Sequence, residues 1–441
     1  MVTTRSSIVK LLIVGLLIRE AFSFWTGHPE DFELWVRLGY YVAHGANPYV
    51  ALPPVPGLSF STQYGSYEAP VIVYLPFWPL VTAGAYLLYT LLGFGDRFVY
   101  YFILKQPEIL GDLLLGYLVY RFILPSSESK AIDALRFWMF FPLSILISAI
   151  WGMFDSLAMS LVLLALVSAT SLRKSLWTGF AVLAKSIPMV FVLPILPPTR
   201  RNIWATLLAL ALPAVTTLAV LDLMGWSFGG FLSAVWGVVP GIGESMSAWD
   251  VFFFLYIVGV SPGLLVPLAS ALALLWIPAV VAAALYGLWK FGYEGKYAMV
   301  QTMILCVLAF LLFKARVNEQ YSLYLIPLGL IDVALWHPER KKLLYLTAAV
   351  TMLFLLVNNN FLIGFLAPIY PSAVQIDLSV SFMLGLYRYG AKLLLGTLFT
   401  VFNVLYLLRV IRSPRVPPIS AEPLPSSALG ASVTTNEPPA L

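Results

Sequence analysis

Charge and cysteine are both scarce in this sequence of 441 residues. Asp, Glu, Lys and Arg make up 11% of the chain, against roughly 25% in soluble domains. The one cysteine, Cys306, lies inside an apolar run, so neither a disulfide framework nor a thiolate metal site can form. The histidines, His28, His44 and His337, are too few and too scattered for a zinc site.

Apolar residues make up 60% of the chain, and runs long enough to cross a bilayer recur along almost all of it. We therefore expect an all-α polytopic membrane protein with about twelve transmembrane helices. The net charge is +5. Its Lys and Arg residues flank the apolar runs, so it does not indicate a nucleic-acid partner. The positive-inside bias predicts that both termini are cytoplasmic.

The whole run 1–412 is interpreted as a single integral-membrane domain. Its first apolar run, Ile8–Phe24, lacks a small-residue cleavage site and is expected to stay as an anchor. Residues 413–441 are rich in Pro, Ser and Ala and predict a disordered cytoplasmic tail.

A large outer loop, Trp25–Pro70, follows the first helix. Pro29 suits the first position of a helix, and apolar residues then recur at helical spacing, which predicts an amphipathic helix lying in the membrane interface. Glu33 and Arg37 are four apart on its polar side and are expected to form an ordinary surface pair. Pro76 and Pro79 interrupt the next apolar run, 71–92, which favours a juxtamembrane or re-entrant helix.

Basic residues flank both ends of the apolar segment Ser175–Pro198. If both ends are cytoplasmic, the segment enters the membrane and returns as a hairpin, with Lys185 near its tip. A lysine in a membrane is a functional hypothesis, because burial without a partner is costly. Lys185 can bind an anion or form a structural ion pair, and a single kinked helix remains the alternative to the hairpin.

Four stretches resemble the polyprenyl(dolichyl)-phosphate-sugar-dependent glycosyltransferases of the type-C (GT-C) superfamily, and above all the GPI mannosyltransferase I branch and its prokaryotic relatives. They are PEDFELW with GANPY, FPLSILISAIWGMFDSLAMSLVLLAL, GFAVLAKSIPMVFVLPIL and RVNEQYSLYLIPL. They occur in the expected order over a module of about 8–330, with further helices over 331–412. The resemblance implies the GT-C fold, with a large first outer loop bearing amphipathic helices.

The resemblance also implies an inverting hexosyltransferase. It would move mannose or glucose from a polyprenyl or dolichyl phosphate to a hydroxyl of a lipid-linked or glycan acceptor on the outer, luminal face. Asp31 would be the general base. Transfer of a sugar from a lipid phosphate to a hydroxyl requires such a base to take the proton of the acceptor. Glu30 is the alternative base, and a solvated acid at a helix start is the structural alternative for Asp31.

The leaving phosphate needs cations, and the candidates are Lys185, Arg316 and Lys314. Residues expected to contact substrate are Asp155, Ser156, Glu319, Gln320, Tyr321 and Glu68. Each group has a structural alternative: a helix cap for Asp155 with Ser156, a loop pair for Arg316 with Glu319, and a solvated loop acid for Glu68.

Two departures from the family pattern leave the metal and the sugar open. Pro29 stands where the mannosyltransferase branch has a first acid, and Met153 stands where relatives carry Gln. A divalent cation, Mg²⁺ or Mn²⁺, is therefore neither required nor excluded. The membrane would be the cell membrane in a prokaryote and the endoplasmic reticulum in a eukaryote.

Two other classes of function compete with the enzyme. A transporter or flippase of a lipid-linked saccharide would show internal repeats and charges along a path across the membrane. The sequence shows no inverted repeat, and its charges gather at one face. A non-catalytic subunit of a glycosylation complex could keep the same motifs.

Overall fold

The computed structural model describes residues 2–61, 72–200, 202–236 and 242–416. Within these ranges the chain forms helices and irregular segments and contains no strand. The elements of the first half are α1 (Val2–Ser23), α2 (Asp31–Ala43), α3 (Phe77–Leu92), α4 (Arg97–Ile123), α5 (Glu128–Phe140), α6 (Pro142–Ile145), η1 (Leu146–Trp151), α7 (Asp155–Val167), α8 (Ser171–Ala184), η2 (Ile187–Phe191), α9 (Val192–Ile195), α10 (Ile203–Leu223) and α11 (Phe228–Trp236).

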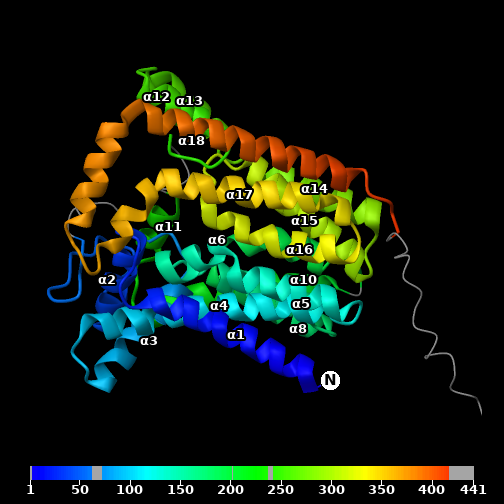
Figure 1. Cartoon of the computed structure of the whole chain (residues 1–441), viewed down its shortest axis with the longest axis horizontal. Coiled ribbons are helices and arrows are strands. Elements are labelled where there is room, and N and C mark those ends of the chain that lie inside the picture. The colour runs from blue at the N-terminus through cyan, green and yellow to red at the C-terminus, as the bar shows by residue number, and fades with distance from the viewer. Residues whose placement is uncertain (1, 62–71, 201, 237–241, 417–441) are drawn as a thin grey trace, which may run out of the picture.

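The second half continues the same architecture. Its elements are α12 (Asp250–Ile257), α13 (Pro262–Leu272), α14 (Trp276–Phe291), α15 (Lys296–Phe313), η3 (Glu319–Tyr324), α16 (Ile326–Leu335), η4 (Pro338–Arg340), α17 (Lys341–Asn358), η5 (Asn360–Leu366) and α18 (Ala373–Ile411). Most of the long helices run side by side, while α2, α3 and α11 gather at one end (Figure 1). The prediction of an all-helical protein is confirmed for the described residues.

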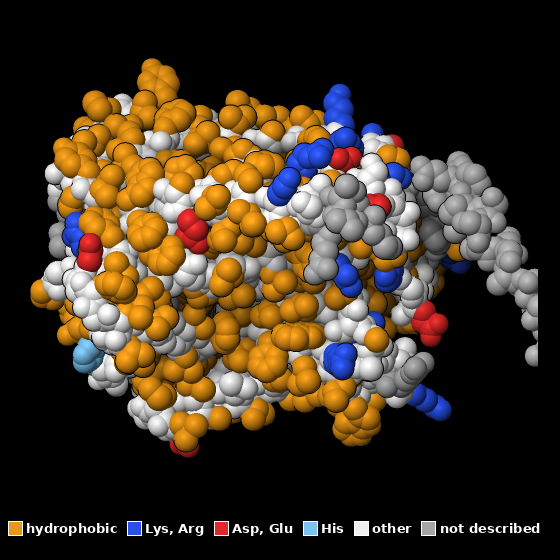
Figure 2. All heavy atoms as spheres, turned by 60° about the horizontal axis from the view of Figure 1, so that its bottom comes forward, with side chains coloured by type: hydrophobic (Ala, Val, Ile, Leu, Met, Phe, Trp, Pro, Cys, Tyr) orange, Lys and Arg blue, Asp and Glu red, His pale blue; other side chains and the backbone are white. Residues whose placement is uncertain are grey.

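Five helical stretches in the described ranges are long and apolar enough to cross a membrane, or six if α5 to η1 counts as one bent span. They are α10, Pro262–Phe291, α15, Pro338–Asn358 and α18. Their exposed surface is rich in large apolar side chains, and one face of the molecule shows these covering most of its length (Figure 2). The structure thus fits an α-helical membrane protein.

Proline interrupts two stretches in which the sequence predicted helices. Pro142 lacks an N–H group and cannot continue α5, so the chain bends by 48° between α5 and the stretch Pro142–Trp151. Pro76 stands directly before α3, which has 16 residues and is short for a full crossing. α3 packs against α2.

The segment around Lys185 goes inward and returns, as predicted. α8 ends at Ala184, Lys185 is its C-terminal cap, and η2 and α9 lead the chain back. The two ends of the segment meet, because Ser171 Oγ donates a 2.8 Å hydrogen bond to Asn202 Oδ1. The single kinked helix is therefore wrong.

Basic side chains gather at the end of the molecule that holds the last turn of α18. Arg340 lies in a buried ion pair there, and Arg409 and Lys290 bond to backbone carbonyls. The view in Figure 2 shows most of its Lys and Arg side chains at one end. The start of α1 lies toward the same end (Figure 1). Ser413, which the sequence assigned to the tail, packs against Arg340, and 417–441 lie outside the described residues.

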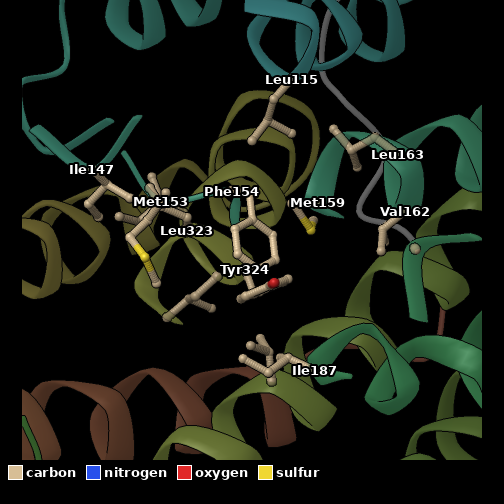
Figure 3. Packing of buried hydrophobic residues seen from close by; sticks show 14 of the residues in the cluster. Leu115, Ile147, Met153, Phe154, Met159, Val162, Leu163, Ile187, Leu323 and Tyr324 are labelled. Carbon is tan, nitrogen blue, oxygen red and sulfur yellow. The ribbon is translucent and has the colours of Figure 1, made fainter. Parts of the chain in front are cut away.

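The core between the two ends is apolar and tightly packed. Figure 3 shows Met153 and Phe154 beside buried residues of α4, α7, η2 and η3. Met153 is 1% exposed, so the position that carries Gln in the resembling family is here a core position. Phe154 stacks on Trp78 with ring centres 4.0 Å apart, which ties the loop before α7 to α3.

α2 differs from its prediction in two ways. The helix begins at Asp31, so Pro29 lies before it, and the His28 side chain accepts from the first backbone N–H groups in place of a proline start. Glu33 and Arg37 are buried, at 2% and 5% exposure, which overturns the surface pair. The physical reason is the loop that follows: it covers this face, and its backbone bonds to both side chains.

The pair of Glu33 and Arg37 therefore holds the first outer loop on α2. Arg37 Nε donates to Glu33 Oε1 at 2.7 Å, and its other nitrogens donate to the carbonyls of Leu52 and Ser61. Burial raises the pKa of the Glu33 carboxyl, and the bonds to Ser59, Arg37 and Phe60 act against that rise. Most of the side chains of α2 are consequently buried within the protein.

Candidate functional site

A cavity of about 570 Å³ lies at the end of the molecule away from the basic network. Its wall comes from segments far apart in the chain that the fold brings together. They are 28–31, Trp151, 244–246, 317–319, Phe354, 358–359, 364–365 and positions 377–389 of α18. Glu30 and Asp31, the predicted bases, and Glu319, a predicted substrate residue, all lie on this wall.

Asp31 opens α2, and its carboxylate faces the cavity with its side chain 30% exposed. The indole of Trp151 donates a 2.9 Å hydrogen bond to Asp31 Oδ2. The backbone N–H of Asp31 donates to His28 Nδ1 at 3.0 Å. The carboxylate is thus held in one orientation, at a helix N-terminus that favours negative charge, while part of it stays open to the cavity.

His28 supports Asp31 without being its ion-pair partner. His28 Nδ1 accepts from the N–H groups of both Glu30 and Asp31, so this nitrogen carries a lone pair and not a proton. The distance of 3.6 Å from Nδ1 to Asp31 Oδ2 is therefore a close approach of two acceptors. The imidazole stacks on Trp151, with ring centres 4.7 Å apart, and this stack fixes the indole that bonds Asp31.

Glu319 is the second acid that the sequence predicted and the cavity contains. It opens η3, is 2% exposed, and accepts a 2.8 Å bond from Asn358 Nδ2. Burial raises the pKa of the Glu319 carboxyl above its ordinary value. It therefore presents a largely desolvated carboxyl to the cavity, suited to accepting or donating a hydrogen bond to a ligand hydroxyl.

The three predicted phosphate-binding cations do not line the cavity. Lys185 Nζ pairs with Asp155 Oδ2 at 2.7 Å, and both side chains are buried. Arg316 Nη2 donates to the Ile242 carbonyl at 3.0 Å, and partial burial lowers the pKa of Arg316. Lys314 lies over the rings of Trp276 and Phe310. Each of these cations already faces a partner on another element.

Asp155 and Ser156 are parts of buried polar pairs below the cavity. Asp155 holds Lys185, while Ser156 Oγ donates to Asp112 Oδ1 at 2.7 Å. Asp112 in turn pairs with Arg19 of α1. These contacts connect α1, α4, α7 and the Lys185 turn, which is a structural role.

Tyr321 is close both to the buried pair of Lys185 and Asp155 and to Asp31. Its ring lies 5.7 Å from Lys185 Nζ, and it is within electrostatic range of both Asp155 and Asp31. Gln320 is buried and does not line the cavity. Glu68, the remaining predicted contact, lies outside the described residues.

Sequence reasoning missed much of the cavity wall, including Trp151, Glu244, Asp377 and Arg388. One signal was present: the run Asn358–Asn360 directly follows an apolar helix. Asn360 begins three successive non-glycine residues with positive φ, at 44°, 55° and 67°, a conformation that costs energy and often marks a functional site. The Asn360 amide holds the turn in place by donating to Asp377 and Ser381.

The second part of the wall depends on a bend in α18. Gly385, with φ of 40°, interrupts this helix of 39 residues, so its first part lies across the cavity end and the rest runs along the bundle (Figure 1). Only glycine adopts such a backbone conformation with φ of 40° and ψ of −124° at low cost. The bend lets residues on both sides of it, Asp377 and Arg388, face the same cavity.

Within the described ranges, no three His, Cys, Asp or Glu side chains lie close enough to hold a metal ion. The chain matches no protein-family model and no curated protein.

Proposed function

We propose that this protein is an inverting glycosyltransferase of the GT-C kind. It would move a hexose, mannose or glucose, from a polyprenyl or dolichyl phosphate to a hydroxyl of a lipid-linked or glycan acceptor. The observation that carries the proposal is the carboxylate of Asp31, which faces a cavity of about 570 Å³ and is oriented by the Trp151 indole. The four ordered sequence stretches described above support the same class.

The proposed reaction needs one base. The acceptor hydroxyl attacks the anomeric carbon of the donor, the bond from that carbon to the phosphate oxygen breaks, and Asp31 takes the hydroxyl proton. The Trp151 N–H donates to Asp31 Oδ2 and so orients the carboxylate for this proton transfer. A single displacement of this kind inverts the configuration of the sugar.

The charge distribution supports an outward-facing site. Lys and Arg gather at the end of the bundle opposite the cavity, and basic ends are cytoplasmic in membrane proteins. With the cavity on the outer or luminal side, both termini are cytoplasmic. The acceptor then reaches the cavity from water, and the prenyl chain reaches it from between helices. The proposed fold is the GT-C fold with about twelve crossings.

Sugar transfer by the purified full-length chain in detergent tests the proposal. The donors are synthetic polyprenyl-phosphate mannose and glucose, offered with a panel of lipid-linked acceptors. Wild-type protein should release polyprenyl phosphate, and Asp31→Asn should lower the rate about a hundredfold or more because the base is lost. Asp96→Asn is the matched control: it removes an exposed carboxylate whose capping role asparagine can keep.

The outcomes separate the candidates. Full activity in Asp31→Asn with lost activity in Glu30→Gln would move the base to Glu30. An absence of turnover with every donor would overturn the enzyme proposal, and a lipid-saccharide flipping assay in vesicles would then test the transporter. Equal loss in Asp31→Asn and Asp96→Asn would indicate misfolding, which a thermal melt of each variant detects.

A further inference from the structure

A lysine on α18 lies directly behind the cavity wall. Lys392 is fully buried, and its one ion-pair partner in the described part of the chain is Glu244. Its ammonium lies 5.8 Å from the ring centre of Phe354 and 5.6 Å from that of Tyr389. Phe354, Tyr389 and Glu244 line the cavity, so the ammonium contacts three residues of the cavity wall although Lys392 does not line the cavity itself.

Arg388 lies one helical turn before Lys392 and lines the cavity itself. Its Nε donates to the Val357 carbonyl at 3.2 Å, and Nη2 donates to the Asn358 carbonyl. These carbonyls end α17, where the helix dipole favours a cation. The guanidinium is thereby held rigidly, with further N–H groups left for a ligand.

The acid that neutralises Lys392 is held less firmly than the lysine. Glu244 is on the loop before α12, and its side chain is 36% exposed, whereas Lys392 is 0% exposed. A buried ammonium needs a negative partner, since an unpaired charge in the interior is costly. Nothing requires that this partner be Glu244, because any anion in the adjacent cavity can supply the charge.

We propose that Arg388 and Lys392 form the phosphate-binding site of the cavity, and that the Glu244 carboxylate holds this site until a phosphate displaces it. The inference rests on the proposed function, in which the phosphate belongs to the lipid donor. A donor phosphodiester carries one negative charge and replaces the carboxylate one for one. The monoester that leaves carries more charge, so the two cations stabilise the leaving group more strongly as it forms.

Equilibrium binding to the full-length protein in detergent tests the site without requiring turnover. The probes are farnesyl phosphate and inorganic phosphate, followed by titration calorimetry. Glu244→Gln should tighten both probes about tenfold, since a competing charged contact is removed. Arg388→Gln should weaken the binding of both probes by about tenfold or more, since a charged hydrogen-bond donor to the phosphate is lost. Arg136→Gln is the matched control, an exposed cation outside the cavity whose loss should leave binding unchanged.

The lysine needs a paired variant because its removal alone leaves Glu244 without a partner. The double variant Glu244→Gln with Lys392→Met removes both charges of the pair. It should lose the phosphate affinity that Glu244→Gln gains. Unchanged or weaker binding in Glu244→Gln would overturn the proposal. So would an effect on farnesyl phosphate alone, which would assign the change to prenyl contacts.

The two proposals can fail separately. Asp31→Asn should bind both phosphates like wild type, because Asp31 acts on the acceptor proton. Phosphate binding through Arg388 and Lys392 without sugar transfer would leave the site standing and reject the enzyme. Sugar transfer with unaltered phosphate affinity in the Arg388 and Lys392 variants would reject the site alone.

Discussion

The two ends of the molecule each bury a cation, but they neutralise it differently. At the basic end, Arg340 bonds to four groups in the described part of the chain: Gln301, Asp332, Ser413 and the Arg409 carbonyl. These come from α15, α16, the last turn of α18 and the residues that follow it. At the cavity end, Glu244 on a loop is the one ion-pair partner of Lys392 among the described residues.

The contrast follows from what surrounds each charge. Asp332 and Arg340 are at most 1% exposed and lie within packed helices, so neither can exchange its partner without moving a helix. Glu244 lines the cavity and lies on a loop, so in our proposal it leaves Lys392 while the bundle stays intact. The first arrangement holds structure together, whereas the second suits the exchange of a ligand.

Breaking the basic-end pair should have the largest effect on stability. Arg340→Met leaves Asp332 buried without its cation and should cost about 3–5 kcal/mol of unfolding free energy. Thermal unfolding in detergent measures the loss, with Arg409→Met, an exposed arginine at the same end, as a control expected to change stability by less than about 0.5 kcal/mol. Phosphate affinity of the folded fraction should not change. Equal melting temperatures for both variants would contradict the structural role of Arg340.

The next effect concerns Asp250, which is 1% exposed. Its carboxyl interacts electrostatically with Lys392 and Glu244. Burial raises its pKa from the ordinary 3.8 to about 6. The folded state therefore binds the proton more tightly than the unfolded state, and this contribution to stability disappears as pH rises from about 4 to about 6.

Asp250→Asn should remove that pH dependence. At pH 7 the variant should be more stable than wild type by about 2–3 kcal/mol, and the gain should vanish below about pH 4 because both side chains are then neutral. Unfolding measured from pH 4 to 7 checks this, and Asp133→Asn, on an exposed carboxylate, should show no such trend. A gain that is equal at every pH would refute the assigned cause.

The smallest effect tests how closely the cavity wall is packed. A Cβ at Gly364 would lie 3.2 Å from Pro29 Cγ and 3.3 Å from Asp377 Cγ, so Gly364→Ala should cost about 1–3 kcal/mol by overpacking. Gly390→Ala, in α18 with no atom within 4 Å, should instead stabilise by about 0.5–1 kcal/mol. Thermal melts of both variants measure the difference. A change in stability of the same sign in both variants would show that the cavity wall has room for a methyl group at position 364.

Composition and order along the chain were enough to predict several features. Apolar runs predicted the helices, because spanning or buried helices need continuous apolar length. The basic flanks around Lys185 predicted its inward-and-return path, since both ends favour the same side. Asp31 was predicted as the leading acid, and it does lie on the cavity wall; its role as a base remains a proposal.

Other features could not be predicted because they depend on which distant segments meet. Glu33 and Arg37 looked like a surface pair, and only the loop folding over them made them internal. Lys185 had an acid available on several segments, and its pairing with Asp155 became clear only in three dimensions. Trp151 bonds Asp31 across 120 positions of the chain.

The sequence by itself determined the helical class, the apolar surface and the separation of basic residues to one end, because each follows from local composition in a membrane environment. The tertiary structure alone decided which charges are enclosed in packed helices and which face a cavity. Burial depends on every segment that covers a side chain, so neighbours distant in sequence enclose Arg340 in packed helices and leave Arg388 facing the cavity.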